Sequence, residues 1–279
     1  MDSNDASIKD DVKDSETKAF NLANQLSESA NAYSAILNAS QPFWNEYGDA
    51  YKSIRTLNHF RLKQIRPLLL AVVTKMKDKQ VESSLRLLVR CSVRFLVVGG
   101  LGGGQLEEKY TEASNEIMSG KIKSAAKLLE VLSPSVPTDA EFQAAFAYVR
   151  VPQSQLAKYY LRALELHLAG DSFPEWLPSD EKGINLEHVL PENPDPEWHV
   201  KKEVVEANWE KFGNLALLKK RLNKKIANRF ITHKTASYAD SSYKLTDELK
   251  GHTTWGPTEI EARQKKMAAL AVKTWPLSL

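Results

Sequence analysis

The spacing of apolar residues is the feature that most constrains this chain. From about residue 16 to residue 168, apolar side chains recur three and four positions apart, as at Leu22, Leu26, Ala30 and Tyr33, which is the period of an α-helix. Glycine and proline interrupt the pattern at Pro42, 99–104, Gly120 and 134–137. The pattern therefore predicts an N-terminal module of helices of ordinary length, joined by short turns, over residues 16–172.

Two segments of the N-terminal region are predicted to lack regular structure. Residues 1–15 are polar and acidic, and such a composition does not offset the entropy of ordering, so we expect a disordered N-terminus. The glycine-rich run at 99–104 invites comparison with a phosphate loop, but it lacks the Gly-Lys-Ser/Thr ending and no β-α-β pattern surrounds it. We interpret it as a flexible turn between helices.

The composition is that of a folded protein without covalent cross-links. Hydrophobic residues make up 42% of the 279 residues and charged residues 26%, which is enough for a substantial core. Cys91 is the only cysteine, so the chain has neither an internal disulfide nor a zinc site built on paired cysteines. No basic leader precedes an apolar stretch, and no apolar run is long enough to span a bilayer. We expect a soluble, cytoplasmic protein with no membrane partner.

The pattern changes after Gly170. Residues 171–183 are rich in turn-forming residues and mark a hinge or a domain boundary. The sequence INLEHVL that follows has the composition of a short strand, and NLALL at 214–218 that of a second strand. Between them an amphipathic stretch is expected to end with Gly213 as a helix C-cap.

Two further helices complete the C-terminal region. The sequence KKRLNKKIANRF at 219–230 predicts a basic helix, and the apolar stripe that includes Ile260 and Trp275 predicts a final helix packed on the core. The order strand, long loop, strand, helix is what a small ββα nuclease core requires. We therefore predict a second domain at 173–279.

Positive charge is concentrated next to these elements. The whole chain has a net charge of only +3, but residues 211–239 contain no acidic residue. The cations in this stretch are Lys211, Lys219, Lys220, Arg221, Lys224, Lys225, Arg229 and Lys234. Such a field suits a polyanion such as DNA. A solvated basic helix face is the alternative interpretation.

Glu187 and His188, adjacent at the end of the first predicted strand, are candidate catalytic residues. Hydrolysis of a phosphodiester needs a base that takes a proton from the attacking water and a cation that stabilises the developing charge. Pro191 breaks the strand just beyond this pair, so carboxylate and imidazole can approach one phosphate from different directions. A hard divalent cation prefers oxygen ligands, which Asn223 and Asn228 also offer. These asparagines are five residues apart, so they cannot face the site equally well.

Several segments together resemble a known family. In chain order they are INLEHVLP, FGNLALL, LNKKIANRFITHK, SYADSSY and EIEARQKKMAALAVKTW. They resemble the C-terminal nuclease domain of GmrSD-type modification-dependent restriction endonucleases, an HNH-related family with a His-Asn-Asn signature. Residues 40–172 resemble the helical segment that precedes this domain. The resemblance implies a mainly α protein in which a helical module is followed by a small ββα-metal (HNH-like) domain with flanking helices.

The resemblance also implies roles for individual residues. His188 corresponds to the general base, Glu187 to a metal ligand, and Asn214 to the asparagine that holds the loop bearing the histidine. Asn223 corresponds to the metal-ligand asparagine and Asn228 to a further asparagine, so we rank Asn223 first, with Mg²⁺ or Mn²⁺ as the expected ion. The candidate phosphate contacts are Lys220, Lys224, Arg229 and Lys234.

The chain departs from the family pattern at two positions. Glu187 stands where many HNH enzymes have aspartate, and Ala216 stands where relatives often have threonine. Neither change removes a group that the chemistry needs. Two other histidines lie nearby. His199 lies in a proline-rich loop, and a second metal ligand is the alternative interpretation. His233 is interpreted as a surface residue, with a contact to phosphate as the alternative.

The expected function is that of a metal-dependent DNA endonuclease, the nuclease part of a modification-dependent restriction (antiviral) system. The family usually adds a nucleotide-dependent sensor domain with an Asp-Gly-Gln-Gln-Arg-like motif, which this sequence lacks. We therefore expect a separate sensor or NTPase subunit, or a missing N-terminal domain. A non-catalytic protein that binds nucleic acid or serves as a scaffold is the alternative, and cleavage of RNA is a third hypothesis.

Overall fold

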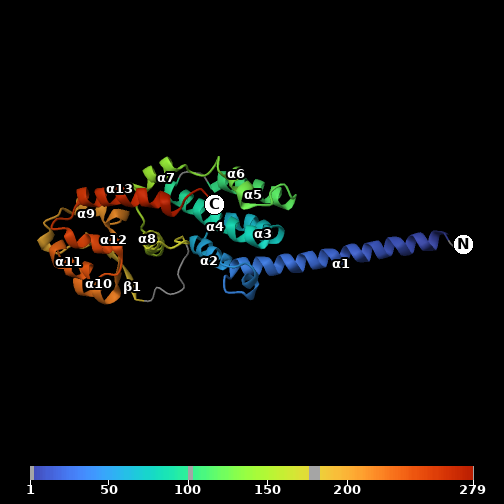
Figure 1. Ribbon diagram of the computed structural model, residues 1–279, viewed down its shortest axis with the longest axis horizontal. Coiled ribbons are helices and arrows are strands. Elements are labelled where there is room, and N and C mark those ends of the chain that lie inside the picture. Colours follow the sequence, from blue (N-terminus) through green and yellow to red (C-terminus); the bar gives the residue numbers. More distant parts are fainter. Residues whose placement is uncertain (1–2, 100–102, 176–182, 279) are drawn as a thin grey trace.

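The computed structural model describes residues 3–99, 103–175 and 183–278, and it is mainly helical, with a small two-stranded sheet (Figure 1). The α-helices of the N-terminal region are α1 (Ser3–Leu37), α2 (Ala50–Phe60), α3 (Arg66–Lys75), α4 (Asp78–Val98), α5 (Gly103–Met118), α6 (Ala125–Leu132), α7 (Asp139–Phe146) and α8 (Ser154–Leu168). Helix ends fall at the predicted breaks, which confirms the helical pattern. Part of the predicted glycine-rich turn, residues 100–102, lies outside the described residues.

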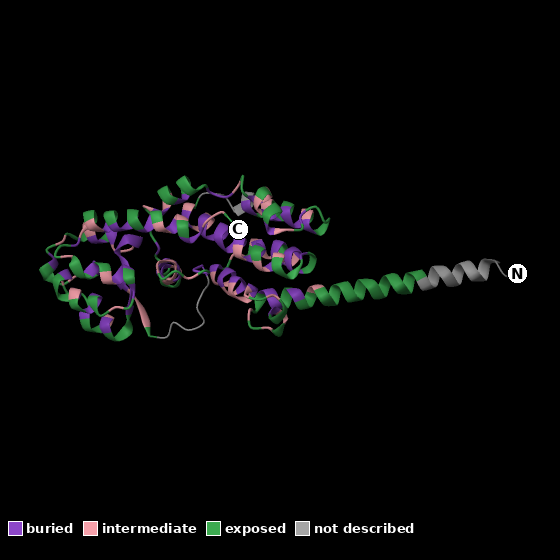
Figure 2. Ribbon diagram, viewed as in Figure 1, coloured by how far each residue is buried: buried purple, intermediate pink, exposed green. Residues whose placement is uncertain are grey.

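Helix α1 differs from the expectation for the N-terminus. Residues 3–15, predicted to be disordered, are helical, and residues 1–2 lie outside the described part. No glycine or proline precedes Pro42, and the Lys18–Asp14 ion pair of 2.6 Å links successive turns. A helix anchored by its buried C-terminal end, at Ala35 and Ile36, therefore propagates toward the N-terminus. Figures 1 and 2 show α1 projecting from the rest of the molecule, and the part of α1 that follows the grey segment in Figure 2 is largely exposed.

The C-terminal region is built around two antiparallel strands, β1 (Ile184–His188) and β2 (Leu215–Lys219). Their register pairs Ile184 with Lys219 and His188 with Leu215. Helix α10 (Lys220–Ile226) follows β2 directly and contacts both strands. The other helices here are α9 (Lys202–Asn208), α11 (Ile231–Ala239), α12 (Lys244–Asp247) and α13 (Pro257–Thr274). The predicted strands and the final helix are confirmed.

Strand β2 separates two apolar cores. Leu215 and Leu217 belong to the large core that includes the N-terminal helices, whereas Ala216 and Leu218 belong to a smaller core beneath α10 and α11. Successive strand residues point to opposite faces, so a strand buried on both sides must be apolar throughout. Helix α13 also reaches both cores, because Ile260 packs in the smaller one and Met267 in the larger. The two regions are therefore joined by shared packing and not only by residues 171–183.

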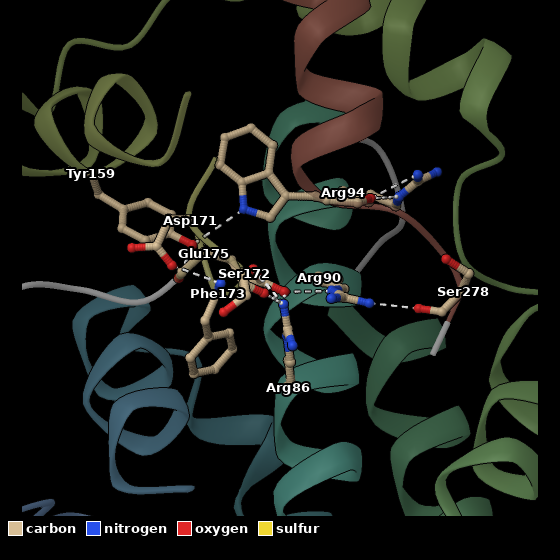
Figure 3. Close-up of polar contacts among 10 residues, drawn as sticks. Arg86, Arg90, Arg94, Tyr159, Asp171, Ser172, Phe173, Glu175 and Ser278 are labelled. Carbon is tan, nitrogen blue, oxygen red and sulfur yellow. Dashed lines mark hydrogen bonds and ion pairs between the residues drawn. The ribbon is translucent and has the colours of Figure 1, made fainter. Parts of the chain in front are cut away.

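Three arginines of α4 attach two chain segments to this helix (Figure 3). Arg86 and Arg90 donate to the carboxylate of Glu175, and Arg90 also donates to the carbonyl of Ser278. Arg94 donates to the carbonyl of Trp275 at 2.8 and 3.0 Å. Because the arginines are spaced four residues apart, they share one helix face. This face fixes the segment up to Glu175 and the end of the chain after α13.

Two local predictions were wrong. Gly213 is not a helix C-cap, because α9 ends at Asn208 and Gly213 lies in a 3₁₀ helix, η4 (Phe212–Asn214). Position 213 needs a glycine for close packing, because a Cβ there would lie 2.2 Å from the carbonyl oxygen of Ile260. The basic helix is shorter than predicted: α10 ends at Ile226, and Ala227 turns the chain with a φ of 44°.

The remaining short elements are 3₁₀ helices: η1 (Pro42–Glu46), η2 (Lys63–Ile65), η3 (Pro196–Trp198) and η5 (Glu248–Gly251). Among the described residues, no helix combines the length and the apolar character needed to cross a membrane.

Candidate active site

The end of β1, the loop after it and the end of α10 enclose a small polar cavity of about 250 Å³. It is lined by Leu186, Glu187, His188, Pro191, Glu192, Asn193, Asn223, Ala227 and Asn228. The antiparallel pairing of β1 with β2 brings β1 beside the helix that follows β2, although the two lie more than thirty residues apart. Four residues that the sequence singles out, Glu187, His188, Asn223 and Asn228, therefore line one cavity.

Glu187 is buried, with 4% of its surface exposed, and its carboxylate has three donors. Oε1 accepts from Nζ of Lys234 at 2.8 Å and from the hydroxyl of Tyr238 at 3.0 Å. Oε2 accepts from Nδ2 of Asn223 at 2.7 Å. Burial raises the pKa of Glu187, and the charge of Lys234 opposes this effect. The carboxylate is thus held at Oε1 from inside the domain and meets Asn223 through Oε2.

His188 is the last residue of β1, and its ring lies against Trp209, with ring centroids 5.3 Å apart and planes inclined by 39°. Burial lowers the pKa of His188, and the nearby charge of Lys234 lowers it further. A histidine with a lowered pKa is neutral at pH 7. A neutral imidazole can accept a proton from water, which is the requirement for a general base.

Asn214 is fully buried and ties together the backbone around His188. Its Oδ1 accepts from the amide of Leu190 at 2.8 Å and from Nε1 of Trp255 at 2.9 Å. Its Nδ2 donates to the carbonyls of Leu190 at 2.8 Å and Trp209 at 3.0 Å. These bonds fix the loop that follows His188 and the residue whose ring lies against the imidazole. A positioning role for Asn214 in catalysis stays a prediction.

The two candidate metal-ligand asparagines differ in their contacts. Asn223 is half-buried and bonds Glu187, while its Oδ1 accepts from Asn185 at 3.3 Å. Asn228 is exposed, and its backbone carbonyl accepts from Nε1 of Trp198 at 3.0 Å. Both line the cavity, but Asn223 is the asparagine in contact with Glu187.

Lys234 does not lie where the sequence analysis expected it. Lys220, Lys224 and Arg229 are exposed, as phosphate contacts must be, whereas Lys234 has 0% of its surface exposed. Its ammonium is directed inward because Glu187 provides a buried carboxylate that needs a cation. Lys234 is therefore removed from the candidate phosphate contacts.

The other nearby histidines are not among the residues that line the cavity. His233 is exposed and lies 3.0 Å from a carboxylate oxygen of Glu197. His199 is exposed at the end of η3, with a φ of 45°.

Two residues of the site were missed by the sequence analysis. Trp209 lies against His188, and Tyr238 bonds Glu187. Tyr238 follows Lys234 by four residues in α11, so the two share one helix face. That spacing was a usable signal for Tyr238, whereas the placement of Trp209 depends on the path of the chain between the strands.

The donor set at the cavity is small for a metal ion. Within residues 3–99, 103–175 and 183–278, no group of three or more His, Cys, Asp or Glu side chains is placed to hold one. Glu187 and Asn223 bond each other here through Oε2 and Nδ2, and Glu192, Asn193 and Asn228 also carry side-chain oxygens along the wall. Any ion bound by this pair would need water or phosphate oxygens to complete its coordination.

Comparison with known proteins agrees with the resemblance. A search of curated proteins finds no significant match. A family model described as the C-terminal domain of GmrSD restriction endonucleases matches residues 136–270, a range that contains both strands and every residue of the cavity. The match starts before the boundary predicted at 173 and so includes α7 and α8. Residues 136–270 are thus similar to the C-terminal domain of GmrSD restriction endonucleases, which supports the resemblance seen in the sequence.

Proposed function

We propose that this chain is the metal-dependent DNA-cleaving part of a modification-dependent restriction system. The observation that carries the proposal is the meeting of His188, Glu187 and Asn223 at one polar cavity, in a domain of a restriction endonuclease family. The order of β1, β2 and α10, with α10 packed on both strands, supports a ββα-metal (HNH-like) arrangement.

In this proposal His188 is the general base. Its lowered pKa keeps the imidazole neutral at pH 7, ready to take a proton from the attacking water. Trp209 supports one face of the His188 ring. Asn214 hydrogen-bonds the backbone of Trp209 and the backbone of Leu190, which follows His188 in the chain. A base held in this way loses little freedom when the substrate binds.

Glu187 and Asn223 would hold Mg²⁺ or Mn²⁺. Both residues carry oxygen donors at the cavity, but Nδ2 of Asn223 donates to Oε2 of Glu187 and Oδ1 of Asn223 accepts from Asn185. The pair therefore fits such an ion only when the Asn223 amide turns so that Oδ1 lies beside Oε2. One carboxylate and one neutral amide add little negative charge where a phosphate must bind. The bound ion would stabilise negative charge on the reacting phosphate and on its leaving oxygen.

The exposed cations of α10 and of the segment just after it would bind the DNA backbone. Lys220, Lys224 and Arg229 extend from the end of β2 past the cavity, and lysine and arginine contacts to phosphate do not discriminate between bases. Recognition of modified DNA is therefore assigned to a sensor subunit or to another domain.

Metal-dependent nicking of supercoiled plasmid tests this function. We expect the protein to nick plasmid with Mg²⁺ or Mn²⁺ and to stop when EDTA is added. His233→Ala, which changes an exposed histidine, serves as a control and should leave nicking unchanged.

A non-catalytic role as a DNA-binding scaffold is the second candidate. It is favoured by one observation, the complete pairing of Glu187 with Lys234, Tyr238 and Asn223, which also suits a purely structural carboxylate. DNA binding without nicking in Mg²⁺ or Mn²⁺ would favour the scaffold and contradict the proposed nuclease.

A further inference from the structure

Lys234 contacts three consecutive residues at the end of β1. Its Nζ donates to Oε1 of Glu187 at 2.8 Å, to the carbonyl of Val189 at 3.1 Å and to the carbonyl of His188 at 3.4 Å. Because β1 ends at His188, the carbonyl of Val189 lies beyond the sheet and needs a donor from elsewhere. One buried ammonium thus holds both the carboxylate and the backbone that carries the histidine.

Tyr238 acts on the same oxygen from the next turn of α11. Its hydroxyl donates to Oε1 of Glu187 at 3.0 Å, and its side chain is fully buried. Oε1 therefore has two donors inside the domain, whereas Oε2 accepts from Nδ2 of Asn223, a residue of the cavity wall that an ion could displace. The two oxygens of one carboxylate are placed in different surroundings.

We propose that Lys234 and Tyr238 are positioning residues, which hold Glu187 by Oε1 so that Oε2 alone is offered to a divalent cation. The inference rests on the proposed function. Two donors on Oε1 disfavour a bidentate contact with the ion and keep Oε2 beside Asn223. Groups that orient a metal ligand in this way commonly change metal affinity or activity by about 10–100-fold when they are removed.

A purely structural ion pair would behave differently. Loss of a hydrogen bond to a structural carboxylate lowers the stability of the fold but leaves the affinity for metal unchanged. Stability and metal binding must therefore be measured on the same variants.

The decisive variant is Tyr238→Phe in the full chain, because it removes the hydroxyl and keeps the buried ring. Lys234→Met is less suitable, since it leaves a buried carboxylate without its cation and endangers folding. Tyr159→Phe is the matched control. It also removes a buried hydroxyl that donates, here to the carbonyl of Glu175 at 2.9 Å, without contact to Glu187.

Mn²⁺ binding to the DNA-free protein is measured by electron paramagnetic resonance of the free ion, and thermal unfolding is recorded without metal. We expect Tyr238→Phe to raise the dissociation constant for Mn²⁺ by about tenfold. Tyr159→Phe should bind Mn²⁺ as the wild type does, although its unfolding temperature falls as well.

Glu187→Gln separates failure of the inference from failure of the proposed function. If Glu187→Gln abolishes Mn²⁺ binding while Tyr238→Phe binds as the wild type does, the positioning role is wrong and the nuclease proposal stands. If the wild type neither binds Mn²⁺ nor nicks DNA with it, the proposed function is wrong and the inference is overturned with it.

Discussion

Glu175 and Glu187 are both buried against cations, and the comparison between them shows what distinguishes a structural carboxylate from a candidate catalytic one. Glu175 has 0% of its surface exposed, and its carboxylate bonds Arg86 and Arg90 of α4 (Figure 3). Glu187 bonds Lys234 and Tyr238 on one oxygen only, and it lines a polar cavity together with His188.

Burial and charge pairing alone therefore do not identify a site. Breaking either pair should cost stability, because a buried charge is left without its partner. The difference lies in the second oxygen of Glu187, which meets Asn223 at the cavity. From this comparison we expect substitutions at Glu175 to change stability alone, and substitutions at Glu187 to change chemistry as well.

Glu187→Gln is expected to have the largest effect, which is a loss of DNA cleavage. Replacing the carboxylate with an amide keeps its shape but removes the charge that would hold the metal, so nicking should fall by about 100-fold or more. Glu175→Gln is the matched variant, and the folded protein should nick plasmid at close to the wild-type rate. Equal losses of nicking in both variants would contradict the claim that Glu187 is catalytic and Glu175 structural.

The next effect concerns stability, which both substitutions should lower, because each leaves a buried cation without its carboxylate. Glu175→Gln leaves Arg90 buried without a carboxylate, so the free energy of unfolding should fall by about 3 kcal/mol. Urea denaturation followed by circular dichroism measures this change. The segment up to Glu175 and the chain end at Ser278 should both become more susceptible to proteolysis, because Arg90 links them. Unchanged stability would show that the arginine face of α4 does not hold these segments.

A smaller effect should separate the two asparagines of the cavity. Asn223 contacts Glu187, whereas Asn228 is exposed, so Asn223→Ala should raise the Mn²⁺ concentration for half-maximal nicking by about tenfold. Asn228→Ala should change it little. The reverse order in a metal titration would make Asn228 the ligand.

The smallest effect is expected from the surface cations. Each phosphate contact adds about 0.9 to the slope of the logarithm of DNA affinity against the logarithm of salt concentration. Lys224→Gln and Arg229→Gln should therefore each lower that slope by about one, with the same change for any DNA sequence. Dependence on DNA modification in these variants would show that α10 takes part in recognition.

Residue patterns predicted much of this fold, because period and turn chemistry are local properties. Both strands, the final helix and the breaks at Gly120 and 134–137 follow from them. The first part of α1, residues 3–15, was missed because low hydrophobicity was given more weight than the absence of glycine and proline. The role of Gly213 was missed because the close approach of Ile260 comes from a helix more than forty residues away in the chain.

Part of the site was also predicted, because some of its residues form local patterns in the sequence. The pair Glu187–His188 and the spacing of Asn214 and Asn223 are visible in the sequence and are brought together at the end of β1. The burial of Lys234 could not be read from a basic stretch, because a lysine points inward only where the fold supplies a carboxylate.

The central claim is that His188 is the base of a nuclease site and not part of a DNA-binding surface. The most direct measurement compares plasmid nicking and DNA affinity of His188→Ala with those of the wild type, at one salt concentration and with Mn²⁺. We predict a loss of nicking by about 10²–10⁴-fold with unchanged DNA affinity, since the exposed cations of α10 are untouched. Nicking by His188→Ala at the wild-type rate would contradict the assignment.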